Sequence, residues 1–313
     1  MLVFLVRRVV GALILAFVVT LLTFGLMTLS GSNVARTIVG TAAPQNIVDA
    51  KAAELGLDRP FLLRYVDWLR HALTGDFGTS WFTNDSVTVL LASKVPVTFS
   101  IVAAAILLSA VVSIVLGVVA AVRGGWTDRV LQALSLLGFA IPGFVLALFL
   151  ALGFAVRLGW FPAIGYVPFG QSPAQWLLSV TLPTVALAAQ VIAGTSQQVR
   201  GSMVDVLRSD FVRTLRSRGI SRTSLYLRHA LRSAAPPALT VLGLQCIGLI
   251  GGTVVVEKVF GLMGLGSALQ GGAGQGDLPV VMGVVTILVL VIVVINLMLD
   301  LAYAWLNPKV RIA

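Results

Sequence analysis

Long apolar runs separated by shorter polar stretches make up most of this chain. Six runs reach the ~20 residues that a helix needs to cross the bilayer core. They cover about 9–29, 97–122, 130–156, 176–198, 238–258 and 279–306. The runs are too long for strands of a membrane barrel and lack the alternation of such strands. The pattern therefore predicts an all-α integral membrane protein with six transmembrane helices.

Prolines near the runs fit this prediction, because membrane helices tolerate them. Pro142 and Pro183 lie inside or near the ends of runs, where proline can kink a helix. Pro236 and Pro237 precede the fifth run, and proline suits a first helical turn.

The first run follows Arg7 and Arg8, as the apolar part of a signal peptide would. It is long for a signal, and the residues after it offer only a weak cleavage site. We therefore expect residues 1–30 to be retained as the N-terminus and first transmembrane helix.

Composition supports a membrane location. Apolar residues make up 58% of the chain and charged residues only 11%, whereas soluble domains have roughly 25% charged residues. The net charge of +10 does not indicate a nucleic-acid partner, because the bases lie between apolar runs, where anionic lipid accounts for them. The single cysteine, Cys246, allows no intrachain disulfide.

The distribution of bases predicts that both termini lie on the cytoplasmic side, since cytoplasmic loops carry the excess of Lys and Arg. In this orientation the inner side holds Arg7, Arg8, Arg123, Arg129, the eight arginines between 200 and 232, Lys309 and Arg311. The outer loops hold fewer bases, together with acids: Asp49, Glu54, Asp58, Asp67, Asp76, Asp85 and Asp277.

The first outer loop, residues 31–96, is far longer than an ordinary connection. Gln45 to Leu55 is predicted to form a short helix. Pro60 is expected to open a second, with Leu63, Val66, Leu69 and Leu73 at helical spacing. The loop is thus expected to be a small helical cap, acting either as a passive lid or as a docking surface for an external partner.

A glycine-rich stretch, residues 260–278, follows the fifth run. Irregular backbone at a membrane boundary is tolerated where protein buries it or where it lines a wet cavity. Two interpretations stay open: a gate that contacts the solute, or a flexible connector.

Catalytic and metal-binding motifs are missing. None of the four lysines is followed by Ser or Thr, so no phosphate-binding loop of the GxxxxGK[ST] type exists. The two histidines, His71 and His229, are predicted to lie on opposite sides of the membrane, which leaves no zinc site. We therefore expect no catalytic residue, no metal and no cofactor in this chain, and no enzymatic activity.

The spans are also nearly free of charge. Arg157, Glu257, Lys258 and Asp300 lie near the ends of runs, where they can reach the interface. A secondary carrier usually keeps ionisable groups near the bilayer midplane. If this chain moves a solute uphill, the energy is expected to come from another subunit.

The stretch from Arg200 to Arg232 carries eight arginines and only two acids, Asp205 and Asp210. Lysine would serve a lipid surface equally well, whereas the planar guanidinium favours directed contacts. Ser209-Asp210 is expected to cap a short helix, Gly219 to end it in a left-handed turn, and Ser221 to cap a second helix. In the second helix Leu227 and Leu231 would form one stripe, and Arg228 and Arg232 another.

The stretch from Asp210 to Pro237 resembles a known family. The run Asp210-Phe-Val-Arg-Thr-Leu-Arg-Ser-Arg-Gly219-Ile-Ser221, followed by Arg228-His-Ala-Leu-Arg232 and Pro237, is similar to the cytoplasmic "EAA" loop of ABC importer permeases. The likeness is to the dipeptide/oligopeptide (and nickel) branch, in its B-type subunit. In that family the loop forms a coupling helix that sits in a cleft of the ATPase. The implied coupling residues are Asp210, Arg213, Thr214, Arg216, Arg218, Gly219, Ser221 and Arg228.

The resemblance covers nearly the whole chain. The outer-loop signature of the family is matched by Gly56-Leu-Asp-Arg-Pro60, Arg64-Tyr65, Trp68-Leu69 and Gly75-Asp-Phe-Gly-Thr-Ser80, which resemble it in order and spacing. A second family signature is resembled by Gly251-Gly252, Val255, Glu257, Val259-Phe260, Gly264-Leu-Gly266 and Asp277-Leu-Pro279. The third-span motif of the family is resembled by Ile141-Pro-Gly-Phe144. The implied docking and outer-gate residues are Asp58, Arg59, Arg64, Trp68, Asp76, Glu257, Phe260 and Asp277.

The chain departs from the family pattern at two places and approximates it at a third. Ser30-Gly-Ser-Asn33 stands where the family has Pro-Gly-Asp-Pro, and Met263 replaces a family proline. Asn307-Pro-Lys309 approximates the family's C-terminal Asp-Pro-Arg.

The resemblance implies a type I ABC importer permease fold, in the bacterial cytoplasmic (inner) membrane. Its core would be residues 97–306, with a coupling loop at 199–237 and a cytoplasmic tail at 307–313. The implied partners are a second homologous permease, two ABC ATPases that bind ATP and Mg, and an extracytoplasmic solute-binding protein.

Polar residues inside the spans are candidates for the solute path: Gln190, Gln245 and Thr253. Hydrogen bonds between helices are the alternative interpretation of these side chains. Gly248 to Gly252 has the GxxxG spacing of close helix contacts, either within the chain or at a subunit seam.

Two other classes of function stay open at this stage. An autonomous channel or secondary carrier would predict a buried charge pair or an inverted repeat, and we find no convincing repeat between 1–156 and 157–313. A structural membrane subunit would leave the basic helices without a purpose. The solute, whether dipeptide, longer peptide, nickel, haem or glutathione, is not specified by these residues.

Overall fold

Helices account for most of the chain in the computed structural model, which describes residues 2–29 and 34–306. Within these ranges there is no β-strand, and Thr79 and Ser86 form an isolated antiparallel bridge. The prediction of an all-α protein is confirmed. The stretch Ser30–Asn33 and the tail 307–313 lie outside the described residues.

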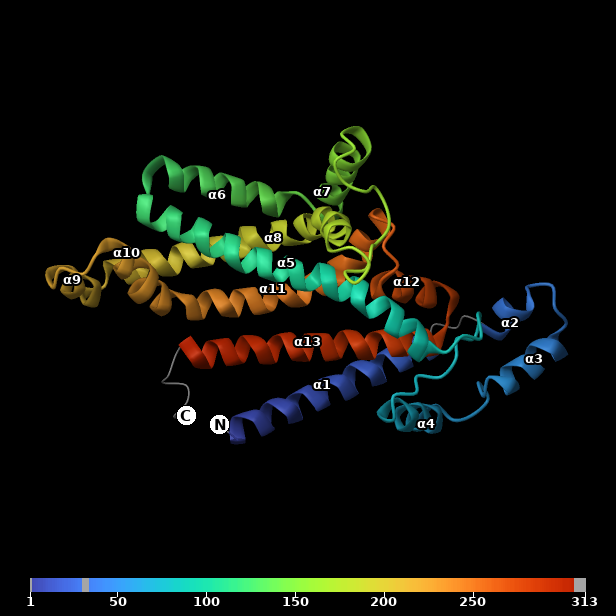
Figure 1. Cartoon of the computed structure of the whole chain (residues 1–313). Coiled ribbons are helices and arrows are strands. Elements are labelled where there is room, and N and C mark those ends of the chain that lie inside the picture. The colour runs from blue at the N-terminus through green and yellow to red at the C-terminus, as the bar shows by residue number, and fades with distance from the viewer. Residues whose placement is uncertain (1, 30–33, 307–313) are drawn as a thin grey trace. The chain divides into compact units, whose positions relative to one another are not determined.

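Five helices are long and apolar enough to cross a membrane (Figure 1). They are α1 (Leu2–Leu29), α5 (Val87–Arg123), α8 (Pro173–Arg208), α11 (Leu231–Val259) and α13 (Leu278–Leu306). A further pair, Gly125–Ala140 and Gly143–Arg157, passes the same test but is bent by 97°. Counted as one broken span, the pair brings the described chain to the six spans that the sequence predicts.

The predicted span over 130–156 is broken at Pro142, where the sequence indicates a kink. Helix α6 (Gly125–Ala140) ends before Ile141, and α7 (Gly143–Leu150) begins after Pro142, followed by a π-helical segment, η1 (Ala151–Arg157). Ile141 is extended, with φ −89° and ψ 115°. Proline disfavours the helical conformation of the residue before it and lacks an N–H, which favours ending the helix at this dipeptide.

Other helix boundaries differ from those expected. Helix α5 begins at Val87, within the predicted outer loop, and contains Pro96. Helix α8 continues to Arg208, so the first part of the predicted 199–237 loop is helical. Pro236 and Pro237 lie inside α11 and do not precede it. Composition marks where a helix must be apolar, but these helices extend beyond the apolar stretch.

The chain divides into two compact units. The first contains residues 1–98 and 263–293, and the second contains 99–262 and 294–313. Helices α5 and α13 each contribute residues to both units.

In the first unit, the described part of the outer loop forms three short helices. They are α2 (Val34–Val39), α3 (Gln45–Glu54) and α4 (Phe61–Leu73). Helix α3 confirms the helix predicted from Gln45, and α4 begins after Pro60 as expected. One core cluster joins α1, α4 and α13 through Phe24, Tyr65, Leu278 and Met282.

The buried face of α4 is not the predicted one. Leu63, Val66 and Leu73 are exposed, and the fully buried residue is Tyr65. Its hydroxyl lies 2.9 Å from Thr20 Oγ1, and its ring meets Phe24 edge-on at 5.5 Å. Because an aromatic side chain with a hydroxyl satisfies both the apolar and the polar surface of α1, it determines the contact face in preference to the leucines.

The glycine-rich stretch 260–278 is also more regular than expected. It contains helix α12 (Leu265–Gln275), which ends at Gly276 with φ +81°. The Leu265 N–H donates to Thr98 Oγ1 at 2.7 Å, and Leu265 is buried in a cluster with Val87 and Leu91. Packing of this kind overrides the low helix propensity of glycine.

In the second unit, α8 packs against α6, α7 and α11. Its buried residues are mostly small or β-branched, among them Ala186, Ala188, Ala193 and Val199. On α5, Gly117 faces Val199, and a Cβ atom built on Gly117 would lie 2.6 Å from Val199 Cβ and 2.8 Å from the Ser196 carbonyl oxygen. The contact between α5 and α8 therefore requires glycine at position 117.

We expect Gly117→Ala to destabilise the protein by ~1–3 kcal/mol, the usual effect of overpacking a core. The apparent melting temperature of the purified transporter in detergent measures this. Gly201→Ala on α8 is the matched control, because a Cβ there meets no atom within 4 Å. Equal melting temperatures for the two variants would contradict the predicted close contact.

Candidate functional site

The segment Ser209–Arg232, called the basic segment below, connects α8 to α11 at one end of the second unit (Figure 1). It contains α9 (Asp210–Ser217), α10 (Arg222–Ser224) and a π-helical segment, η2 (Leu225–Ala230). Gly219 lies between α9 and α10 with φ +75°. The structure thus has the two short helical pieces and the left-handed glycine that the sequence predicts.

The ends of these helices are capped differently from each other. Ser221 caps α10 as expected, its Oγ accepting a hydrogen bond from the Ser224 N–H at 3.4 Å. Ser209 occupies the N-cap position of α9, but its hydroxyl donates to the Val206 carbonyl and makes no cap. The predicted cap at Ser209 is wrong, because the hydroxyl bonds back to the end of α8.

Buried apolar residues hold the basic segment in place. Val212 of α9 and Leu225 of η2 are each 1% exposed. Ala230 at the end of η2 belongs to a buried cluster with Val199 and Met203 of α8. The segment is therefore fastened to the helices on either side of it.

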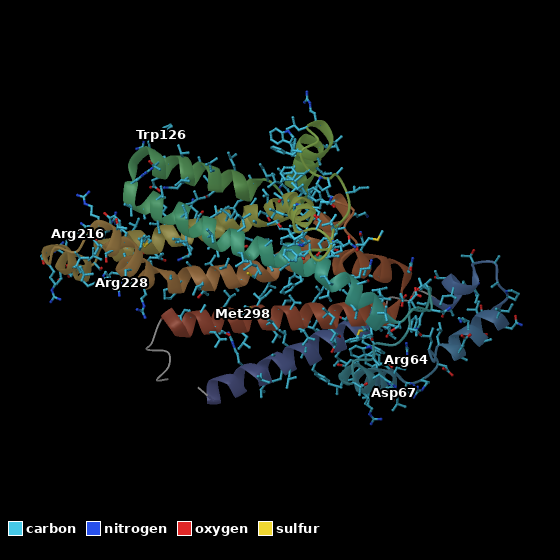
Figure 2. All side chains as sticks on the ribbon, viewed as in Figure 1. Arg64, Asp67, Trp126, Arg216, Arg228 and Met298 are labelled. Atoms are coloured by element: carbon cyan, nitrogen blue, oxygen red, sulfur yellow. The ribbon has the colours of Figure 1, made fainter. Side chains whose placement is uncertain are left out.

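The predicted coupling side chains lie on the outside of this segment. Exposed residues are Asp210, Arg213, Thr214, Arg216, Arg218, Gly219, Ser221 and Arg228. Figure 2 shows Arg216 and Arg228 at the same end of the second unit. Arg213 lies 3.4 Å from Asp210, but both side chains are more than four-fifths exposed, so this ion pair adds little stability.

Apolar side chains are exposed among these arginines. Phe211 is 43% exposed and Leu227 57%. The predicted stripe of Leu227 with Leu231 is wrong: the π-helical turn separates their directions, and Leu231 packs against the buried cluster while Leu227 does not. Exposed apolar residues in the same segment as exposed arginines form a surface suited to a protein partner.

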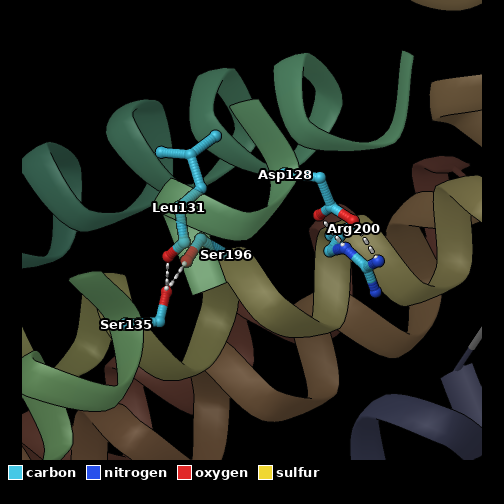
Figure 3. A network of polar contacts seen from close by, with 5 residues as sticks. All are labelled: Asp128, Leu131, Ser135, Ser196 and Arg200. Carbon is cyan, nitrogen blue, oxygen red and sulfur yellow. Dashed lines mark hydrogen bonds and ion pairs between the residues drawn. The ribbon is translucent and has the colours of Figure 1, made fainter. Parts of the chain in front are cut away.

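Arg200 has a different role from the other arginines. It lies on α8 and forms a two-pronged ion pair with Asp128 of α6, with Nε on one carboxylate oxygen and a terminal nitrogen on the other at 2.5 Å (Figure 3). Beside it, Ser135 Oγ donates to the Leu131 carbonyl at 2.9 Å. Asp128 was not among the residues predicted from the sequence, where its only signal is an acid among bases at the end of a span.

The predicted outer-loop residues divide into exposed and packed ones. Asp58, Arg59 and Asp76 are exposed. Arg59 pairs with Asp67 at 2.6 Å, and an Asp76 oxygen accepts from the Gly78 N–H at 2.9 Å.

Arg64 and Trp68, by contrast, are partly buried on α4. The Arg64 guanidinium lies 5.6 Å from the centre of the Phe24 ring. Desolvation by burial lowers the pKa of Arg64, the positive charge of Arg59 lowers it further, and Asp58 raises it. Both side chains pack where they can stabilise the cap.

Asp277 is buried, with 2% exposed. Its carboxylate accepts hydrogen bonds from the Ser80 hydroxyl and, at 3.3 Å, from the Trp81 N–H. It also precedes the first turn of α13, where a negative charge is favourable. In this conformation Asp277 joins the outer loop to the start of α13, and Ser80 is its partner that sequence reasoning missed.

The other two residues predicted for the outer gate, Glu257 and Phe260, are 0% and 2% exposed. They lie at the end of α11 and in the turn that follows it. The Phe260 carbonyl accepts from the Gly165 N–H at 3.0 Å, which joins this turn to the loop after η1. These residues are enclosed by the chain.

Gln190 and Gln245, predicted for the solute path, line the same pocket of about 250 Å³ in the second unit. The pocket lies between α7, α8 and α11. Thr253 is not among its lining residues: it is buried, and its hydroxyl donates to the Ile250 carbonyl at 2.7 Å. The structure brings together two of the three predicted path residues.

Comparison with known families gives two matches that cover almost the whole chain. Residues 113–312 match "Binding-protein-dependent transport system inner membrane component". Residues 1–102 match the N-terminal part of the membrane component of the same transport systems.

Individual relatives agree with these matches. A Brucella abortus (strain 2308) protein named "Putative peptide transport system permease protein" is 39% identical over 97% of this chain and 98% of its own length. A glutathione transport system permease protein from Shigella flexneri serotype 5b is 34% identical over 99% of both chains.

Among solved structures, a chain of the MetNI methionine ABC transporter in an inward-facing conformation is similar. The TM-score is 0.57 at 17% identity, and the match covers 70% of this chain and 96% of that one. At this identity the likeness concerns the fold, and it agrees with the predicted type I importer permease fold.

Replacing Asp277 tests the contact that joins the outer loop to α13. We expect Asp277→Ala to destabilise the protein by ~1–3 kcal/mol, because the Ser80 hydroxyl and the Trp81 N–H lose a buried acceptor. A double-mutant cycle with Ser80→Ala, read by melting temperature, measures the coupling between the two side chains.

Asp58→Ala is the control for this cycle, since Asp58 is exposed and should change stability by no more than ~0.5 kcal/mol. Additive effects of Asp277→Ala and Ser80→Ala would show that the two residues do not interact.

Proposed function

We propose a function that starts from the family: this chain belongs to the binding-protein-dependent transport system inner membrane components. It is thus a multi-pass membrane permease of an ABC transport system. Our proposal is that it is one of two permease subunits of an ATP-driven importer, that it forms half of the solute path, and that the solutes are dipeptides or oligopeptides.

The proposed coupling to ATP hydrolysis is supported by the basic segment. Its buried residues, Val212 and Leu225, fix it to the body of the second unit, while Arg213, Arg216 and Arg228 are exposed. An arginine-rich surface with exposed Phe211 and Leu227 can fill a cleft in a partner and form charge-assisted hydrogen bonds there. Closure of two cytoplasmic ATPases around ATP and Mg would then move the segment as a lever.

Helix α8 supplies the connection from this lever to the solute path. It runs without interruption from Pro173 to Arg208 and carries Gln190 of the pocket. Since a packed helix moves as a body, motion of the basic segment rocks the helices between outward and inward openings. A solute-binding protein on the outer side would deliver the solute to this path, with Asp58, Arg59 and Asp76 among the exposed residues available to it.

The proposal of peptide substrates is supported by the names of the relatives. The Brucella abortus relative is named for peptide transport and the Shigella flexneri relative for glutathione, a tripeptide. Both cover nearly the full chain. A solute that carries peptide bonds is what these two have in common.

Purification of the tagged chain from its native membrane in mild detergent, followed by mass spectrometry, tests the assembly. We expect a second six-span permease and one or two P-loop ATPases to remain bound. If the chain purifies alone, even after cross-linking, the basic segment is only an orientation signal, and an autonomous carrier or channel becomes the better explanation.

Substitution of Gly219 tests the coupling mechanism. Gly219 has φ +75°, so Gly219→Leu forces a left-handed residue at a cost of ~1–2 kcal/mol and disturbs the bend between α9 and α10. We expect transport to fall about tenfold or more relative to ATP hydrolysis in proteoliposomes, a loss of the order that this strain implies.

Gly219→Asn is the matched control, because asparagine tolerates the left-handed conformation and no neighbouring atom lies within 4 Å of a Cβ at this position. It should keep most of the coupling. Wild-type coupling in Gly219→Leu would overturn the assignment of the segment.

A further inference from the structure

The pocket between α7, α8 and α11 contains two carboxamides in otherwise apolar surroundings. Besides Gln190 and Gln245, its described lining is glycine and apolar side chains, with no charged group. Gly143, Gly248 and Gly252 give it walls of bare backbone. Its volume of about 250 Å³ is far more than a single water molecule needs.

Gln190 uses only part of its hydrogen-bonding capacity. Its Nε2 donates to the Ile141 carbonyl at 3.3 Å. That carbonyl lies at the break before Pro142, where the helix ends. The bond fixes the orientation of the carboxamide, so its oxygen is available as an acceptor on the pocket side, 3.9 Å from where a Cβ on Gly143 would be.

Gln245 has more capacity unused. Within the described part of the chain its carboxamide makes no hydrogen bond, and it offers both a donor and an acceptor. Its position depends on Gly194, since a Cβ on Gly194 would lie 2.6 Å from Gln245 Nε2. A carboxamide without a protein partner in an apolar wall favours water or a ligand that can satisfy it.

From this arrangement we propose that the pocket binds the peptide backbone of the solute. One peptide unit has one N–H donor and one C=O acceptor. The Gln245 amide donates to the carbonyl, and the Gln190 carboxamide oxygen accepts from the N–H. This inference rests on the proposed peptide function and specifies the part of the solute that the permease recognises.

Three features favour backbone recognition over side-chain recognition. The absence of charge from the described lining leaves nothing to select acidic or basic side chains or the charged termini. The glycine walls leave room for side chains of different shape. Hydrogen bonds between neutral groups are individually modest, which lets the solute be released, as any translocation site requires.

The first experiment measures uptake of labelled tripeptides by the complete transporter in proteoliposomes. The peptides are Ala-Ala-Ala, Ala-Leu-Ala, Ala-Lys-Ala and Ala-Glu-Ala, together with an Ala-Ala-Ala analogue in which one amide is replaced by an ester. We expect Gln245→Leu to lower kcat/KM about fivefold for all four peptides, since one neutral hydrogen bond is lost in each case. The ester lacks the N–H from which Gln190 accepts, so the analogue should be taken up less well than Ala-Ala-Ala by the wild type and should cause no further loss in Gln190→Leu.

A steric pair of variants provides a second, independent test. Gly248 lines the pocket, and a Cβ built on it meets no atom within 4 Å. The leucine side chain of Gly248→Leu can therefore occupy the pocket without displacing its walls. Gly251→Leu lies on the same helix, equally unobstructed but outside the lining, and is the control. Uptake of all peptides should fall in the first variant, while the ATPase activity stimulated by the binding protein and the assembly of the complex should match the second.

The outcomes separate this inference from the proposed function. If the wild-type transporter takes up none of the peptides, the peptide function and this inference fall together. If peptides are taken up equally by wild type, Gln245→Leu and Gly248→Leu, the backbone site alone is overturned. A loss in Gln245→Leu limited to one of the four peptides would also overturn it, because the pocket would then recognise a side chain.

Discussion

Close packing around α8 is the constraint on which the second unit depends. In a membrane, helices associate through small residues and interhelical hydrogen bonds, since lipid gives no hydrophobic driving force. Helix α8 meets this requirement with Ala186, Ala188 and Ala193 facing its neighbours, and Gly117 of α5 accommodates Val199. The ion pair from Arg200 to Asp128 adds a directed contact near its end (Figure 3).

Helix α8 connects the pocket to the basic segment. Gln190 lies in the pocket, and Arg208 is the last residue of α8 before the basic segment. The two residues are eighteen positions apart, which corresponds to about 27 Å at 1.5 Å per residue. Buried Val212 and Leu225 in turn hold the basic segment to the body of the unit. In the proposed mechanism, a displacement of the exposed arginines would reach the pocket through this helix.

The sequence was sufficient for the helical class, for the spans as apolar runs, and for the glycine bend at position 219. Those features depend on length, composition and local conformation. It was insufficient where packing decides. Pro142 indicated a kink in the run 130–156 but not a break of 97°, the stretch around Leu265 formed a helix despite its glycines, and Tyr65 rather than the leucines determined the face of α4.

The candidate site, too, could be predicted from the sequence only in part. The arginines of the basic segment were evident from composition, but Asp128 and Ser80 were not, because their partners Arg200 and Asp277 are distant in sequence. The shared pocket of Gln190 and Gln245 depends on how three helices meet. No pattern along a single helix contains that information.

Docking of the basic segment on an ATPase is tested most directly by site-specific cross-linking. The single native cysteine, Cys246, is buried, so a cysteine introduced as Arg216→Cys is the reactive one at the surface. In native membranes, a cross-linker at this position should capture a P-loop ATPase, whereas Arg70→Cys on exposed α4 should not. Labelling of Arg216→Cys without capture of an ATPase, under conditions in which the transporter is active, would contradict the account.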